Sequence, residues 1–68
     1  MARFICIYQQ EYQEKTWVDV DSIYLISQEK QEHYRLYLPG HDILVSKNTA
    51  HKIALMLGIC LEAYPDLI

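Results

Sequence analysis

Few residues in this chain have types and spacing that could support chemistry. His41 and Asp42 are adjacent, and His51 follows further along the sequence. An acid–base or metal site would need these groups to meet where a predicted hairpin ends and a predicted helix begins. The alternative is a solvated loop and an imidazole on the helix surface. If the protein had an activity, these three residues would be the first to mutate.

A second candidate is the carboxylate pair Asp19 and Asp21. The two residues lie two positions apart, so they share a face if this stretch is a strand. A catalytic pair is one interpretation of that spacing. The favoured interpretation is an outward polar face that alternates with Val18 and Val20.

The motifs of cofactor and metal chemistry are absent from the sequence. Gly40 and Gly58 are its only glycines, so neither a phosphate-binding glycine loop nor a dinucleotide fingerprint can form. Cys6 and Cys60 lie far apart and the histidines fall in different predicted elements, which is not the spacing of a zinc site. We therefore expect a protein that is not an enzyme and that uses no metal and no cofactor.

The cysteines and the apolar runs also suggest a location. Cys6 and Cys60 indicate a reducing cytoplasm, where free thiols in apolar stretches behave as small hydrophobic groups. A disulfide between them, closing nearly the whole chain, is the less favoured alternative. No secretory signal precedes the first predicted strand, and the apolar run over residues 53–61 is shorter than the roughly 18–20 residues that cross a bilayer. The sequence predicts a cytoplasmic protein without a membrane partner.

Length, composition and charge limit the class of protein. At 68 residues and 51% hydrophobic content, we expect one small globular domain over residues 1–68. Domains of this size often depend on a partner for stability. The formal charge is −3 and the six basic residues are dispersed singly. Because contact with successive phosphates needs clustered Lys and Arg, nucleic acid is not favoured as a partner.

The clearest secondary-structure signal lies in the second half of the chain. Tyr34, Leu36 and Leu38 alternate with more polar residues, which predicts a strand with one buried face. Pro39 and Gly40 break the strand, and we expect a loose loop there that extends to Asp42. The predicted order is strands over 3–8, 17–21, 23–26, 34–38 and 43–46, polar segments over 9–16 and 27–33, and a helix from about Thr49 to Leu61.

Some details of these predictions stay open. Residues 9–16 are read as a loop or a ragged continuation of the first hairpin, and residues 27–33 as a solvent-exposed turn. The interruption at Asp21 and Ser22 is either a bulge or a single helical turn. Ser46 or Asn48 caps the predicted helix. The fold class is α+β, with a small antiparallel meander of three to four strands and one C-terminal helix packed on the sheet.

The predicted helix is apolar around its circumference. Its core stripe is Ala50, Ile53, Ala54, Leu57 and Leu61. Further apolar residues fill other faces, and an apolar strip of that width is typical of an interface. The alternative is that strands of the same monomer wrap both sides of the helix. The interface residues we predict are Leu55, Met56, Ile59, Cys60 and Tyr64.

Tyrosine is the outlier in the composition. The chain has six tyrosines, joined by one tryptophan and one phenylalanine. Tyr combines an apolar ring with a polar tip and is enriched at interfaces, although it is also common in strands. We therefore predict a non-catalytic protein-interaction or regulatory module. It would act as a homodimer through the apolar helix and a tyrosine-rich surface, and another protein is the alternative partner.

The order of elements over residues 18–57 gives an alternative. The run Val-Asp-Val-Asp-Ser-Ile-Tyr-Leu-Ile, a polar segment, Tyr-Arg-Leu-Tyr-Leu, a turn, Ile-Leu-Val-Ser and a helix resembles the β-rich LytTR-type DNA-binding domain. It is also similar to the short flagellar and swarming-motility protein family. The first resemblance implies a nucleic-acid-binding regulator that uses Arg35, Lys47 and Lys52. Residues 58–68 hold neither the His nor the Arg that the LytTR type carries after its helix.

Overall fold

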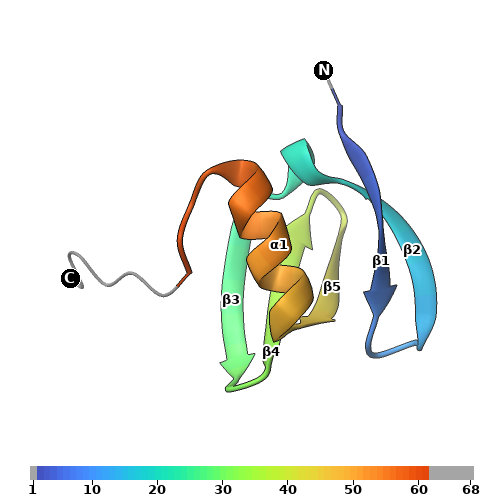
Figure 1. Cartoon of the computed structure of the whole chain (residues 1–68). Helices are drawn as coiled ribbons and strands as arrows, with labels where there is room; N and C mark the ends of the chain where they lie inside the picture. Colours follow the sequence, from blue (N-terminus) through green and yellow to red (C-terminus); the bar gives the residue numbers. More distant parts are fainter. Residues whose placement is uncertain (1, 62–68) are drawn as a thin grey trace.

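The computed structural model describes residues 2–61 as five strands, one short 3₁₀ turn and one α-helix. Figure 1 shows these elements in their spatial arrangement. The order is β1 (Phe4–Gln9), β2 (Glu14–Asp19), η1 (Val20–Ser22), β3 (Leu25–Lys30), β4 (His33–Leu38), β5 (His41–Ser46) and α1 (Lys47–Leu57).

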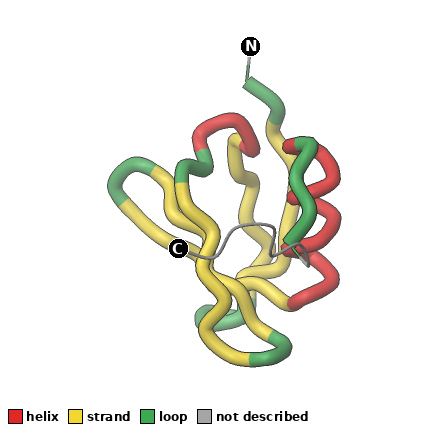
Figure 2. Tube along the Cα trace, turned by 90° about the vertical axis from the view of Figure 1, so that its left-hand side faces the viewer, coloured by secondary structure: helices red, strands yellow, loops and turns green. Residues whose placement is uncertain are grey.

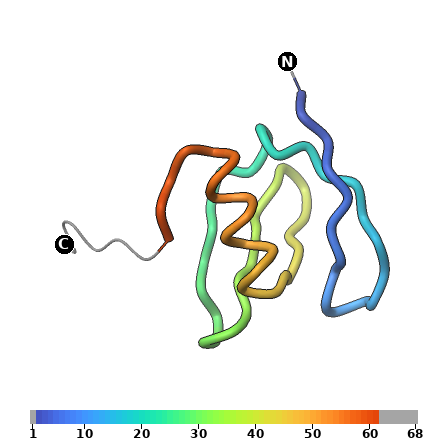
Figure 3. Tube along the Cα trace, viewed as in Figure 1, coloured from blue at the N-terminus to red at the C-terminus, as the bar shows by residue number. Residues whose placement is uncertain are grey.

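The strands form two antiparallel sheets. β1 and β2 make a two-stranded hairpin, and β3, β4 and β5 make a three-stranded meander with β4 in the middle. Seen from the side, α1 lies along one face of the strands (Figure 2). The trace in Figure 3 places the hairpin at one side of the molecule and β3 at the other. The predicted α+β class, with an antiparallel meander and one helix, is confirmed.

The hydrophobic core lies between the meander, the helix and the inner face of the hairpin. In β4 the buried residues Tyr34, Leu36 and Leu38 alternate with half-buried ones, as the sequence predicts. The same period of two buries Ile43 and Val45 in β5. The remaining core residues are Ile7, Val18, Val20, Ala50, Ile53 and Ala54.

The turn between β4 and β5 is tighter than we expected. Leu38 pairs directly with His41, so only Pro39 and Gly40 connect the two strands, and the predicted loop to Asp42 is wrong. Proline fixes a negative φ at the first turn position, and Gly40 takes a φ of 85° at the second. Because glycine adopts positive φ without a steric cost, these two residues are enough to reverse the chain.

The polar segment 27–33 is strand for most of its length, which corrects the prediction of an exposed turn. β3 continues to Lys30 and β4 begins at His33, so only Gln31 and Glu32 lie between them. β3 is the outer strand of the meander, where polar and charged side chains are well tolerated. The backbone pairing with β4 therefore continues where hydrophobic alternation has stopped.

The first hairpin also extends further than its apolar residues indicate. β1 reaches Gln9 and β2 starts at Glu14, so the continuation of the hairpin is the interpretation that holds. Gln9 is buried, and its Nε2 donates to Thr16 Oγ1 at 2.8 Å. Within residues 2–61 β1 pairs with β2 alone, and its outer face is exposed.

The interruption at Asp21 and Ser22 is a helical turn and not a bulge. The turn η1 spans Val20–Ser22, and the Asp19 side chain accepts from the Asp21 N–H at its start. Val20 is fully buried, while its N–H donates to Arg3 O at 2.8 Å. The turn thus redirects the chain from the hairpin to the meander.

The helix is shorter than predicted. Ser46 caps its first turn by accepting from the Thr49 N–H at 3.3 Å, and α1 ends at Leu57 rather than at Leu61. Gly58 takes a left-handed conformation with φ 74°, and its N–H donates back to the carbonyls of Ala54 and Leu55. This is the usual glycine termination of a helix. It is therefore Gly58 that ends the helix.

We expect Gly58→Ala to lower the free energy of unfolding by about 1 kcal/mol, because an L-residue at this φ is strained. The added Cβ itself meets open space, so the cost comes from the backbone conformation. Chemical denaturation with Gly58→Asn as a matched variant checks this. Asparagine tolerates the left-handed region better than alanine, and equal losses for the two variants would contradict the explanation.

Candidate functional site

The most prominent unpartnered feature is the apolar surface around the end of α1. Within the helix, Ala50, Ile53 and Ala54 face the core and are buried. Leu55 points the other way and is 80% exposed, and Met56 is 38% exposed. The described strands of the monomer therefore do not enclose the second face of the helix.

Two more of the predicted interface residues reach this surface by a different route. Ile59 and Cys60 lie beyond the end of α1, in the segment that follows Gly58. Ile59 is 49% exposed and Cys60 is exposed with a free thiol. Tyr64, the fifth predicted residue, lies outside the described residues. The turn at Gly58 thus adds loop residues to a surface that the sequence assigns to helix alone.

Sequence reasoning missed the part of this surface that β3 contributes. Tyr24, just before β3, is 68% exposed, and Leu25, the first residue of β3, is 51% exposed. A groove of about 290 Å³ connects them to Ile59, and it is lined by Ile23, Tyr24, Leu25, Ile26, Leu57, Ile59 and Leu61. We call Tyr24, Leu25, Leu55, Met56, Ile59 and Cys60 the C-terminal apolar surface.

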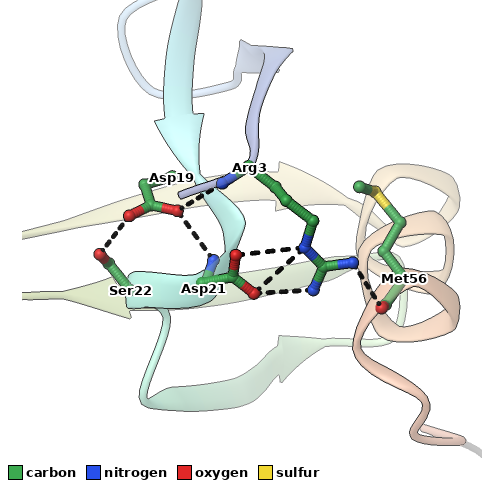
Figure 4. Close-up of polar contacts among 5 residues, drawn as sticks. All are labelled: Arg3, Asp19, Asp21, Ser22 and Met56. Atoms are coloured by element: carbon green, nitrogen blue, oxygen red, sulfur yellow. Dashed lines mark hydrogen bonds and ion pairs between the residues drawn. The ribbon is translucent and has the colours of Figure 1, made fainter. Parts of the chain in front are cut away.

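An arginine network fixes the helix end that carries this surface (Figure 4). The Arg3 guanidinium bonds the Asp21 carboxylate, with Nη2 at 2.7 Å from Oδ1, and its Nη1 donates to Met56 O at 3.2 Å. Asp19 accepts from the backbone N–H groups of Arg3 and Asp21 and from Ser22 Oγ. The network therefore joins β1, η1 and the end of α1.

The same network accounts for the predicted carboxylate pair. Hydrogen bonds from Arg3 lower the pKa of Asp21, and in return raise the pKa of Arg3. Asp19 instead caps η1. Each carboxylate thus has its own structural partners, and the structure favours this role over a shared catalytic one.

Arg35 lies on the outer face of β4, opposite the face that packs against the helix. Its guanidinium contacts three carboxylates from three elements. These are Glu11 from the hairpin turn (Nη2 to Oε2, 3.0 Å), Asp42 from β5 (Nη1 to Oδ1, 3.1 Å) and Glu29 from β3. The hydrogen bonds of Glu29 and then Glu11 raise the pKa of Arg35, and those of Arg35 lower the pKa of both glutamates. This cluster ties the hairpin turn to the meander.

We expect the Arg35 cluster to make stability depend on pH in the acid range. The pKa of Glu11 and Glu29 is lowered in the folded state, so their contribution is complete above the ordinary value of 4.5 and is lost as the pH falls through the lower folded value. Arg35→Met should lower the melting temperature at pH 7 by several degrees, and should flatten its fall between about pH 5 and pH 3.

Circular-dichroism melts of the unmodified protein and of Arg35→Met across this pH range measure the change in melting temperature. Lys52→Met, which removes one exposed positive charge from the helix, is the matched control. If Arg35→Met and Lys52→Met changed the pH profile equally, general charge rather than the cluster would explain the dependence.

The basic residues of the nucleic-acid alternative do not share one surface. Arg35 is engaged by the three carboxylates on the outer face of the sheet. Lys47 and Lys52 lie on α1, which packs against the opposite face. The backbone N–H of Lys47 donates to Glu32 O at 2.9 Å. The arrangement thus gives little support to a continuous phosphate-binding surface.

The candidate acid–base residues are also separated. His41 pairs with Leu38 at one end of the β4–β5 pair, whereas His51 lies in α1 and is placed near Tyr34, toward the other end of β4. The His51 ring packs edge-on against Tyr34 with ring centroids 6.0 Å apart. Asp42 contacts Arg35. Residues 2–61 contain no group of three or more side chains placed to hold a metal ion.

The two cysteines form no disulfide with each other. Cys6 and Cys60 are both free and exposed. Cys6 lies on the outer face of β1 directly opposite Trp17 in β2. The apolar neighbours of Cys6 in the sequence alternate between the two faces of β1, so they do not bury it.

Together these elements define a small α+β domain with an exposed apolar surface at the end of its helix. No protein family, curated protein or solved structure matches the chain. In the part of the chain that the structure describes, no helix has the length and apolar character needed to cross a membrane.

Proposed function

We propose that this chain is a non-catalytic protein-interaction or regulatory module that acts as a homodimer through the C-terminal apolar surface. The observation that carries the proposal is the exposure of Leu55 and Met56 in the last turn of α1, and of Ile59 just after it, in a chain of only 68 residues. Tyr24 and Leu25 face Ile59 across a groove and extend the apolar surface. Tyr24 is one tyrosine of the tyrosine-rich surface that we propose. Several large apolar side chains exposed around one helix end are typical of interfaces.

The sizes involved fit self-association. A standard interface covers about 800 Å² of each partner, roughly a sixth of the 4975 Å² surface of this chain. Apolar area removed from water contributes about 25 cal/mol per Å² before the costs of association. A chain this small retains a net stability of only a few kcal/mol on its own. Burial in a dimer would therefore add substantially to the stability of the folded state.

The position of the Arg3 network supports the same proposal. It fixes the end of α1 through Met56 O, so the backbone that carries Leu55 and Met56 is held before any partner binds. Preorganisation of this kind reduces the entropy lost on association. We also place the protein in the cytoplasm, since both of its cysteines are free.

The melting temperature tests this proposal, because dimerisation coupled to folding makes it depend on protein concentration. We expect it to rise by several degrees between about 5 µM and about 500 µM chain. A melting temperature that stays constant over this range would contradict the proposal.

A further inference from the structure

Two large aromatic side chains are exposed on the outer face of the first hairpin, which β1 and β2 form (Figure 1). Trp17 is 69% exposed and Phe4 is 63% exposed. The strand register places Phe4 opposite Asp19 and Trp17 opposite Cys6, so the two rings are diagonal neighbours across the hairpin. Exposed Trp and Phe side by side offer a large apolar contact area with little side-chain entropy to lose.

These rings border a groove of about 260 Å³ between the hairpin and the β4–β5 turn. The buried residues Val18 and Leu38 contribute to its floor. The groove is lined by Phe4, Trp17, Val18, Asp19, Ser22, Leu38, Pro39 and His41. Pockets for drug-sized small molecules usually measure about 300–1,000 Å³. This smaller, open groove is better suited to one or two side chains of a peptide.

The charge of the residues that line the groove favours a positively charged ligand. The Asp19 carboxylate lines it and is held in place by the N–H groups of Arg3 and Asp21 and by Ser22 Oγ, all neutral donors. Among the described residues that line the groove, Asp19 is the only carboxylate, there is no Lys or Arg, and His41 is the only imidazole. A fixed carboxylate beside an exposed indole ring suits a cation, which the ring face attracts as well.

We propose that this groove binds an extended peptide segment of another protein that carries an arginine or lysine next to an apolar residue. The apolar side chain enters the groove above Val18 and Leu38. The cationic group lies between the face of Trp17 and Asp19. A second copy of this chain is the less suitable occupant, because a symmetric contact would bring two Asp19 carboxylates to the same interface.

Selection from a library of random decapeptides on the immobilised protein tests this proposal. We expect the enriched peptides to share a basic residue next to an apolar one. A selected peptide without tryptophan is then synthesised and titrated while the fluorescence of Trp17, the only tryptophan of the chain, is recorded. Replacing its basic residue by Gln should weaken binding about 10-fold, as should Phe4→Ala or Asp19→Asn in the protein.

Tyr12→Ala is the control, because Tyr12 is 71% exposed but lies on the hairpin turn outside the groove. Its affinity for the peptide should match that of the unmodified protein, and thermal melts verify that each variant is folded. The proposal is overturned if the library yields no enrichment over a Phe4→Ala/Trp17→Ala protein, if the consensus is acidic, or if folded Asp19→Asn binds the peptide unchanged. Leu55→Asp should bind it with unchanged affinity, so a failure of dimerisation and a failure of peptide binding can be told apart.

Discussion

Leu36→Ala is expected to leave a large fraction of the chain unfolded at 25 °C. Leu36 is fully buried in β4, the middle strand of the meander. Truncating a buried leucine to alanine costs roughly 2–5 kcal/mol through lost transfer free energy and the cavity that remains. A core of this size rarely supplies more than about 3–5 kcal/mol of net stability. One substitution is therefore enough to remove most of it.

Chemical denaturation followed by circular dichroism measures this loss. Leu44→Ala is the matched control, because Leu44 lies on the neighbouring strand β5 but is only half-buried, on the outer face. Its loss should be clearly smaller. Equal losses for Leu36→Ala and Leu44→Ala would show that the core is not where the structure places it.

Leu55→Asp is expected to separate the proposed dimer into monomers. Because Leu55 is 80% exposed, a carboxylate at this position costs the monomer little. In a dimer the same carboxylate would be buried against apolar side chains without a partner, which is strongly unfavourable. We expect the dissociation constant to rise roughly 100-fold or more, the effect of removing a central interface residue.

Sedimentation equilibrium of the unmodified protein and of Leu55→Asp at equal concentrations measures the change in the dissociation constant. Tyr12→Asp introduces the same charge at a site that is 71% exposed but outside the C-terminal apolar surface. This control should keep the mass of the unmodified protein. If Tyr12→Asp dissociated the dimer as well as Leu55→Asp does, the interface would have to lie elsewhere or depend on net charge.

The sequence predicts the meander and the helix because their core residues follow the periods of strand and helix. Tyr34, Leu36 and Leu38 alternate, and Ala50 and Ile53 recur at helical spacing. Hydrophobic periodicity does not predict a strand whose backbone pairing needs no apolar side chains. β3 continues past Ile26 because Gln28 and Lys30 pair with Tyr34 and His33 of β4, with an irregularity in the register between them.

The helix end and the Arg35 cluster show two further limits. A continuous apolar run across Gly58 looks like one helix, but the left-handed conformation of this glycine ends α1 and turns the chain away. The Arg35 cluster joins Glu11, Glu29 and Asp42 across long stretches of sequence, and no spacing rule indicates that they meet. Tyr24 and Leu25 were missed for a similar reason, because a strand-like pattern does not say which residues the helix leaves uncovered.

The mass of the unmodified chain in solution tests the central claim most directly. Sedimentation equilibrium from about 1 µM to about 1 mM covers the affinities expected of a modest interface. If the chain dimerises as proposed, its mass rises from 8.1 kDa toward twice that value as the concentration increases. A mass that stays at 8.1 kDa across the whole range would contradict it.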